Sequence, residues 1–195
     1  VGYLAFMLPG LITMASMTQS YGTATEINIA RFYWRIFEEF QMAPVAAWEI
    51  ALGEVLYGML RGLAAAAVVY GLALGFGVRL SLTAPAFALL GLHTFAFASA
   101  AVVAAMVVRS HADQGHINTF FIVPMSFLCG TFFPLDRLPG WAEAAAWCLP
   151  LTHSSLAIRA VALGRPVPLA NVAVLAAFAA AFFSLAVWSV RRASA

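Results

Sequence analysis

The stretch GTFFPLDRLPGWAEAAAWCLPLTHSSLAIRAVALG occupies residues 130–164 of a 195-residue chain that is 64% hydrophobic. Pro134, Pro139 and Pro150 interrupt this stretch. The two apolar pieces on either side of Pro150 would form helices of about 15 to 18 Å, whereas the hydrocarbon core of a membrane is about 30 Å thick. Neither piece can cross a membrane, so the sequence predicts two short helices at this point in place of one crossing.

The composition indicates an all-α integral membrane protein. Only 9% of the residues are charged, and the mean hydropathy is +0.93, whereas soluble domains carry about 25% charged residues. The ten basic residues are all arginine, so the lysine that a phosphate-binding loop requires is missing. The formal net charge of +2 gives no sign of nucleic-acid binding. We therefore expect neither ATP binding by this chain nor a nucleic-acid partner.

Five segments are apolar over about 20 residues, the length that a spanning helix needs. They are residues 2–22, 55–78, 84–108, 117–134 and 169–190. Because arginines collect on the cytoplasmic side of membrane proteins, their placement predicts that loops 23–46 and 109–116 and the C-terminus are cytoplasmic. The polytopic chain then forms one transmembrane domain, residues 1–195, with five crossings.

Residues 138–164 are predicted to form a re-entrant helical hairpin before the last crossing. Thr152 is a candidate N-cap of the second helix, and Gly164 is a candidate stop. Irregular backbone at membrane depth persists only where protein or water surrounds it, so the hairpin should pack inside the bundle. There, His153 would need a polar partner on a neighbouring helix. The alternative is an amphipathic pair lying on the outer interface.

The stretch EINIARFYWRIFEEFQMAPVAAWEIALGE, residues 26–54, contains a predicted amphipathic helix that ends at Pro44. Aromatic and aliphatic residues recur at helical spacing along one face, and Arg31, Arg35, Glu38 and Glu39 occupy the other. From the spacing alone, a helix resting on lipid headgroups is favoured. The alternative is a rigid lever between two crossings that a cytoplasmic partner could push.

Both stretches resemble the permease subunits of ATP-binding-cassette exporters of the second type, the ABC-2 family, and in particular its nodulation-factor, polysaccharide and multidrug export branch. The first stretch carries the family's Glu, Ala-Pro, Glu-Ile and Gly at Glu38, Ala43-Pro44, Glu49-Ile50 and Gly53. The second carries its more specific pattern at Phe133–Asp136, Leu138-Pro139, Trp141, Pro150–His153 and Arg159.

The resemblance implies six crossings with both termini in the cytoplasm, so the first crossing would be missing here. It implies a coupling helix at about residues 31–43 and a re-entrant pair between the last two crossings. The expected coupling residues are Arg31, Arg35, Glu38, Glu39, Pro44 and Glu49. The expected re-entrant gate comprises Pro134, Asp136, Pro139, Trp141, Pro150, Thr152 and His153.

The resemblance also implies a transport subunit that performs no covalent chemistry. A separate cytoplasmic ATPase subunit would bind ATP and Mg²⁺, and a second permease copy would complete the pathway in the bacterial cytoplasmic (inner) membrane. No cofactor is expected in this chain. The substrate would be amphipathic, such as a lipid-linked saccharide, an antibiotic or a drug.

Two other classes of function compete with this hypothesis. A secondary transporter driven by an ion gradient also uses broken helices, but it needs an acidic group at mid-membrane, and we expect every carboxylate here near an interface or a loop. An intramembrane enzyme needs a histidine near a carboxylate, and His93 has none within one helical turn.

Several individual histidine and arginine residues are expected to have structural roles. His93 is expected to be a hydrogen-bonded packing residue. Arg61 shares a helix face with Glu54, seven residues earlier, and is expected near the cytoplasmic entrance with its charge extended to the interface. His111 and His116 lie in a loop without enough further ligands, so no metal site is expected.

Overall fold

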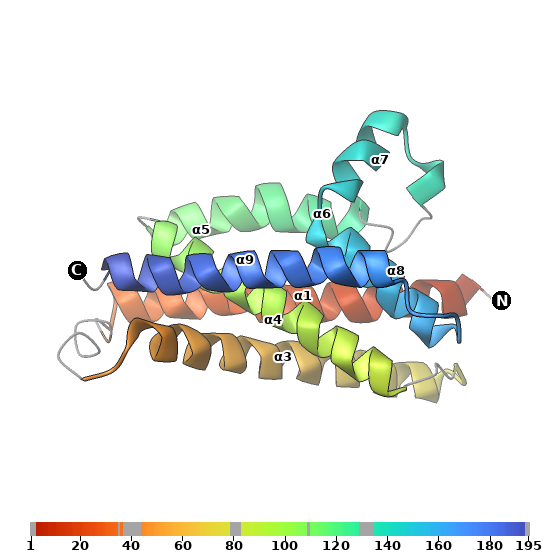
Figure 1. Cartoon of the computed structure of the whole chain (residues 1–195), viewed down its shortest axis with the longest axis horizontal. Helices are drawn as coiled ribbons and strands as arrows, with labels where there is room; N and C mark the ends of the chain where they lie inside the picture. Colours follow the sequence, from red (N-terminus) through yellow and green to blue (C-terminus); the bar gives the residue numbers. More distant parts are fainter. Residues whose placement is uncertain are drawn as a thin grey trace.

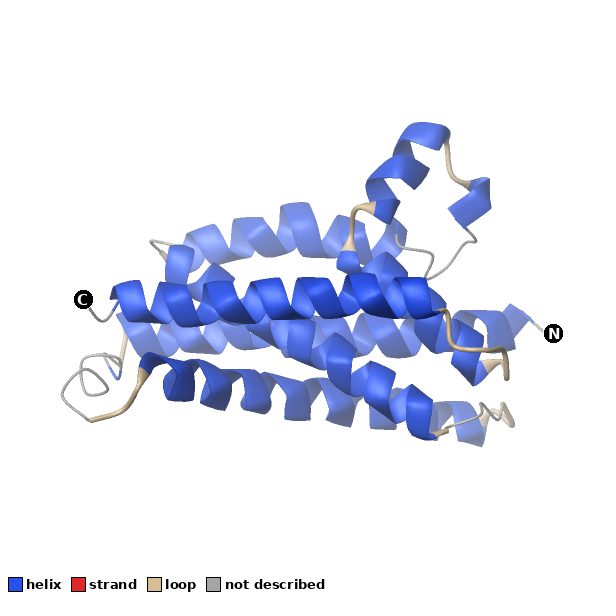
Figure 2. Ribbon diagram, in the orientation of Figure 1, coloured by secondary structure: helices blue, strands red, loops and turns tan. Residues whose placement is uncertain are grey.

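Four long helices run side by side along the longest axis of the molecule (Figure 1). The computed structural model describes residues 3–34, 36, 44–78, 83–108, 110–128 and 135–193, and these contain helices and turns but no strand (Figure 2). The long helices are α1 (Tyr3–Phe32), α3 (Ala47–Gly75), α4 (Ala84–Val107) and α9 (Leu169–Ala193).

Shorter helical pieces complete the fold between α4 and α9. A broken run consists of α5 (His111–Ile117), a π-helical turn (Asn118–Ile122) and α6 (Val123–Leu128). A 3₁₀ turn (Leu135–Arg137) then precedes α7 (Gly140–Trp147) and α8 (Pro150–Ala162). Figure 1 shows α8 at one end of the bundle and α7 projecting away from it.

Among the described residues, three helices are long and apolar enough to cross a membrane: α3, α4 and α9. The prediction of an all-helical protein with membrane-spanning helices is confirmed, whereas the count of five crossings stays a prediction. Helix α3 begins at Ala47, well before the predicted start at residue 55. The predicted crossing at 117–134 falls on the broken run of α5 to α6, and its residues 129–134 lie outside the described residues.

Helix α1 corrects the predicted boundary between the first crossing and the cytoplasmic loop. The loop was expected to begin at residue 23, but α1 continues without a break to Phe32. Its buried side chains Met17, Tyr21, Ala24 and Ile27 follow each other at helical spacing. Packing of this face against the bundle therefore extends the helix beyond the apolar segment that hydropathy alone identifies.

Two glycines of α3 allow α1, α3 and α4 to approach each other closely. A Cβ atom on Gly62 would lie 2.8 Å from Thr94 Cγ2 on α4 and 2.9 Å from the backbone oxygen of Ser16 on α1. One on Gly58 would lie 2.8 Å from Ala98 Cβ. Gly58 and Gly62 are four residues apart, which is the small-residue spacing that lets membrane helices pack backbone to backbone.

Glycine also ends two helices. Gly77 after α3 and Gly164 after α8 have positive φ values of 76° and 72°, a conformation that glycine adopts at little cost. Behind each, the chain bonds back to the last helical turn in the Schellman pattern, as in the 2.8 Å bond from the Arg165 N–H to the Ala160 carbonyl. The prediction that Gly164 stops the second short helix is confirmed.

The contact at Gly62 gives a test of the fold. We expect Gly62→Ala to lower the thermal unfolding midpoint of the purified protein in detergent, because the new methyl group meets backbone at Ser16 that cannot move aside. Overpacking of this kind lowers the free energy of unfolding by about 1 to 3 kcal/mol. Gly71→Ala on the same helix is the matched control, since nothing lies within 4 Å of its Cβ position. Equal midpoints for the two variants would refute the packing argument.

Candidate functional site

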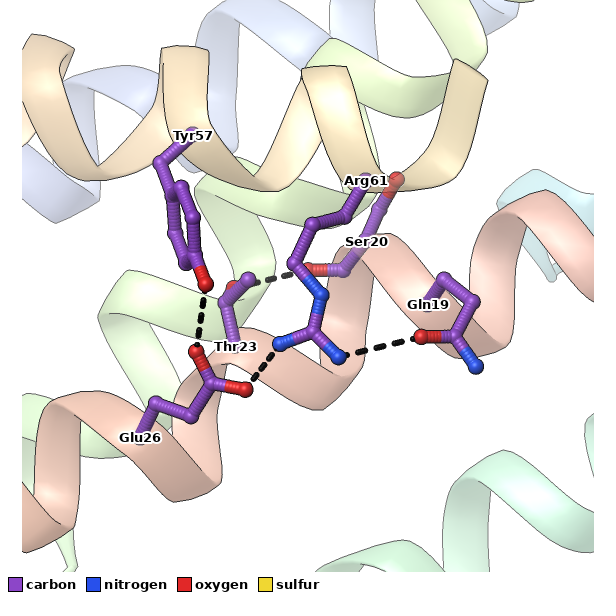
Figure 3. Close-up of polar contacts among 6 residues, drawn as sticks. All are labelled: Gln19, Ser20, Thr23, Glu26, Tyr57 and Arg61. Atoms are coloured by element: carbon purple, nitrogen blue, oxygen red, sulfur yellow. Dashed lines mark hydrogen bonds and ion pairs between the residues drawn. The ribbon is translucent and has the colours of Figure 1, made fainter. Parts of the chain in front are cut away.

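A cluster of polar side chains joins α1 to α3 (Figure 3). Arg61 forms an ion pair with Glu26 and donates a second hydrogen bond of 3.1 Å to Gln19 Oε1. The other carboxylate oxygen of Glu26 accepts a 2.9 Å bond from the Tyr57 hydroxyl. The Arg61 and Glu26 side chains are 31% and 45% exposed. The cluster therefore faces outward from this chain while its charges are paired.

Arg61 lies near the middle of the bundle, whereas Glu26 lies six residues before the end of α1. Gly62, the neighbour of Arg61, packs against Ser16 and Thr94, which lie near the midpoints of α1 (Tyr3–Phe32) and α4 (Ala84–Val107). The prediction that Arg61 lies near the cytoplasmic entrance with its charge extended to the interface stays a prediction; within α3, Arg61 lies fourteen residues after the first residue, Ala47. Its guanidinium is bonded to α1, and its carboxylate partner is Glu26, not Glu54.

Glu26 lies six residues before the end of α1 at Phe32, so the prediction that every carboxylate lies near an interface or a loop stays a prediction. Glu26 was assigned to the cytoplasmic loop, but it belongs to α1 and reaches Arg61. A charged side chain within a spanning segment is costly unless it is paired or meets water. Arg61 and Tyr57 provide the pairing.

An apolar groove between α1 and α3 adjoins the cluster. Its first part has a volume of about 560 Å³, with Thr18, Gln19 and Arg61 among its lining residues. A second, apolar part of about 340 Å³ also includes Val69 and extends to Phe76. The groove is therefore apolar along most of its length and polar where it meets Gln19 and Arg61.

The break between α7 and α8 is the second candidate feature. The predicted capping role of Thr152 is wrong, because α8 begins at Pro150 with Leu149 as its N-cap. Proline is favoured at the first helical position, where the helix needs no N–H donor. Thr152 instead donates a 2.5 Å hydrogen bond to the Ala146 carbonyl at the end of α7.

His153 reinforces the same junction. Its Nε2 lies 3.0 Å from the Trp147 carbonyl oxygen, and because a carbonyl only accepts, Nε2 carries the hydrogen. Its Nδ1 is then an acceptor and lies 3.4 Å from the side-chain amide of Asn171 on α9, which can donate to the ring when its NH₂ group faces Nδ1. The predicted contact of His153 with a neighbouring long helix is confirmed. Together with Thr152, His153 bonds the exposed carbonyl end of α7 and links it to α9.

The two short helices differ in their surroundings. Helix α8 contacts α1, α4 and α9, and Leu151, Thr152 and Ala157 are fully buried. Helix α7 contacts α6, α8 and the preceding turn, and Trp141 is 76% exposed. Helix α8 therefore packs inside the bundle and α7 projects from it, and the re-entrant hairpin stays a prediction. Pro139 lies directly before α7, at its N-cap.

The expected coupling residues are only partly described. Arg31 lies in the last turn of α1 and donates a 2.5 Å hydrogen bond to the Ala105 carbonyl near the end of α4. Pro44 lies at a bend before α3, and the Glu49 carboxylate accepts a 2.8 Å bond from the Ala46 N–H at the start of α3. The remaining expected positions lie outside the described residues: Arg35, Glu38, Glu39, Pro134 and the side chain of Asp136.

Sequence reasoning missed the partners of Arg61. Gln19 and Glu26 are seven residues apart, and Tyr57 and Arg61 are four apart, so each pair lies on one face of a helix. This polar stripe is visible in the sequence. It was overlooked because residue 26 was assigned to a loop, and only the packing of α1 against α3 brings the two stripes together.

His93 is a packing residue, as predicted. It is fully buried in α4, its Nε2 donates a 3.1 Å hydrogen bond to the Thr13 carbonyl on α1, and its ring centroid lies 4.9 Å from that of Phe97. Among the residues that the structure describes, no group of three or more histidine, cysteine and carboxylate side chains could hold a metal ion.

The described part of the chain is all-helical, with three helices long and apolar enough to cross a membrane. The chain belongs to the ABC-2 type transporter family, whose sequence profile matches residues 2–163. It is 32% identical over 171 residues to Nodulation protein J of Rhizobium meliloti (strain 1021) and 34% identical over 172 residues to that of Rhizobium leguminosarum bv. trifolii. These matches cover 85% and 86% of this chain.

A third relative is the inner membrane transport permease YadH of Escherichia coli (strain K12), which is 30% identical over 201 residues, covering 96% of this chain and 74% of YadH. The chain spans 64% of the length of each of the two nodulation proteins. No solved structure gives a significant match. Of these relatives, YadH is the one whose name describes a transport permease.

The junction between α7 and α8 gives a second test. Thr152→Ala should lower the free energy of unfolding in mixed micelles by about 1 kcal/mol, because it removes a buried hydrogen bond to the Ala146 carbonyl. Thr152→Ser keeps the hydroxyl and should retain most of the stability. If the serine and alanine variants lose equal stability, the methyl group rather than the hydroxyl stabilises the junction.

Proposed function

We propose that this chain is the membrane-spanning subunit of an ATP-driven exporter in the bacterial cytoplasmic membrane. A separate ATPase subunit supplies ATP hydrolysis, and two permease copies form the pathway. Membership of the ABC-2 type transporter family supports this proposal, as does the similarity to a protein named as an inner membrane transport permease. Five crossings and a re-entrant α7–α8 pair belong to the same proposal.

The polar cluster carries the proposal for the transport route. The Glu26–Arg61 pair between α1 and α3 is partly exposed, and lipid tails could not hydrogen-bond it. A water-filled pathway can solvate such a pair, and an amphipathic molecule can contact it while its chain follows the groove toward Phe76. The substrate proposed here is therefore amphipathic: a lipid-linked saccharide, an antibiotic or a drug.

The α7–α8 junction is proposed as a gate at the outer end of this route. Its carbonyls are bonded by Thr152 and His153, and His153 also contacts α9. A movement of α9 could therefore be transmitted to α7 through one side chain. The position of this junction at the end of the bundle opposite the C-terminus (Figure 1) agrees with an outward-facing role.

An ion-gradient-driven transporter is the second candidate, because Glu26 is an acidic group within a long helix of the bundle. Its carboxylate is already engaged by Arg61 and Tyr57, which favours a structural pair over an ion-carrying site. The two mechanisms predict different energy sources. Export that continues after ATP depletion and stops when the ion gradient is collapsed would support the second candidate and refute the first.

The route is tested by neutralising the pair. The double variant Glu26→Gln/Arg61→Gln keeps hydrogen-bonding groups but removes both charges. In inside-out vesicles containing the partner ATPase, we expect uptake of an amphipathic substrate to fall about tenfold, the effect of losing about 1.5 kcal/mol from one charged hydrogen bond. Arg165→Gln, which alters an exposed loop residue, is the control. Unchanged uptake by the folded double variant would remove the cluster from the route.

Coupling to the ATPase is tested in the predicted coupling helix. Charge reversal at Glu38 and Glu39 should leave the ATPase able to hydrolyse ATP while transport per ATP decreases, because the docking face on the partner would meet like charges. Asp113→Lys reverses an exposed charge at the start of α5 and should leave coupling unchanged. Normal coupling in the folded double variant would contradict the docking role of residues 31–43.

A further inference from the structure

A hollow of about 460 Å³ lies where α1, α4 and α9 end together. Arginines from two of these helices line it, Arg31 from α1 and Arg192 from α9. The remaining lining residues are Met106, Val107, Trp188, Ser189 and Ala193. The hollow is at the same end of the bundle as the C-terminus (Figure 1). It is separate from the groove beside Arg61, and of its lining residues only Arg31 falls within the predicted coupling segment, residues 31–43.

The charges of the two arginines are not neutralised by a carboxylate in the part of the chain that the structure describes. Arg31 donates to the Ala105 carbonyl, and its guanidinium carbon lies 5.0 Å from the Phe32 ring centroid. The guanidinium carbon of Arg192 lies 5.4 Å from the Trp188 ring centroid. The described lining of the hollow contains no acidic residue. Two positive charges therefore border one hollow.

Interaction with carbonyl groups at helix ends explains only part of the placement of these two arginines. Arginine near a helix C-terminus is stabilised by the carbonyl groups there, and Arg31 has this role at α4. That bond uses one of the five N–H donors of a guanidinium. The other donors, and those of Arg192, can bind an anion. Arginine binds phosphate oxygens well because its planar fork can donate two parallel hydrogen bonds.

The apolar lining indicates which kind of anion fits. Trp188 is 55% exposed and Val107 is 66% exposed, and tryptophan is enriched where membrane proteins cross the headgroup region. A free inorganic anion would leave this apolar surface uncovered. A phospholipid would place its phosphate between the arginines and its glycerol and first methylene groups against Trp188 and Val107.

We propose that this hollow, lined by Arg31, Arg192 and Trp188, binds the headgroup of an anionic phospholipid. Basic pockets between membrane helices are suited to such headgroups, and each arginine near the membrane surface contributes about 1 kcal/mol. The bound lipid would connect the ends of α1 and α9, which meet at this hollow.

The test measures lipid binding by the purified full chain in detergent. Phosphatidylglycerol and phosphatidylcholine with identical acyl chains are titrated separately, and the thermal unfolding midpoint is followed. We expect phosphatidylglycerol to raise the midpoint in a saturable way and phosphatidylcholine to have little effect. Arg192→Gln should weaken the binding of phosphatidylglycerol about fivefold, as expected for the loss of one surface charge of about 1 kcal/mol.

Arg191→Gln is the matched control, because it removes the same charge from the adjacent position but does not line the hollow. If the basic helix end attracts anionic lipid only in a general way, both variants will bind phosphatidylglycerol equally well, and that result would overturn the proposal. Equal binding of the two lipids would also overturn it. A third titration uses inorganic phosphate: if phosphate saturates the same Arg192-dependent shift, the site is for free anions and the lipid assignment is wrong.

Discussion

The close approach of α1, α3 and α4 at Gly58 and Gly62 is the contact on which the arrangement of the bundle depends. In a membrane, apolar side chains gain little by leaving lipid, so helices associate through close packing and interhelical hydrogen bonds. Glycine permits this packing because a Cβ atom at either position would overlap α1 or α4. The same approach places Arg61 within reach of Glu26 and Gln19. Packing and the polar cluster therefore have a common origin.

Helix α1 shows how a polar segment can be buried without many partners. The hydroxyls of Thr13, Ser16, Thr18 and Thr23 bond to carbonyls of their own helix, as in the 2.9 Å bond from Thr13 to Pro9. Such bonds satisfy serine and threonine locally. A charged group has no such option, so Glu26 and Arg61 must find each other or water. This difference separates the structural polar residues of α1 from the candidate transport residues.

Backbone carbonyl groups at the junction of α7 and α8 also need hydrogen-bond partners. The last carbonyls of a helix have no intrahelical partner, and Thr152 and His153 bond two of them at the end of α7. At the far end of α8, Gly164 turns the chain so that backbone N–H groups bond back to the helix. A broken helix can then persist beside an apolar bundle. The break is stabilised mostly by residues that immediately follow it in sequence.

The sequence by itself determined the class of the protein, the break near Pro150, the stop at Gly164 and the packing role of His93. These properties depend on composition, proline and glycine chemistry and local spacing, which act over a few residues. Only the tertiary structure decided that α1 extends to Phe32, that α3 starts at Ala47, and that α8 is buried while α7 lies outside. Contacts between distant segments set these boundaries. The pairing of Glu26 with Arg61 also depends on contacts between distant segments, since these residues are 35 apart in sequence. The polar residues on one face of α1 or of α3 do not by themselves specify which helix that face will contact.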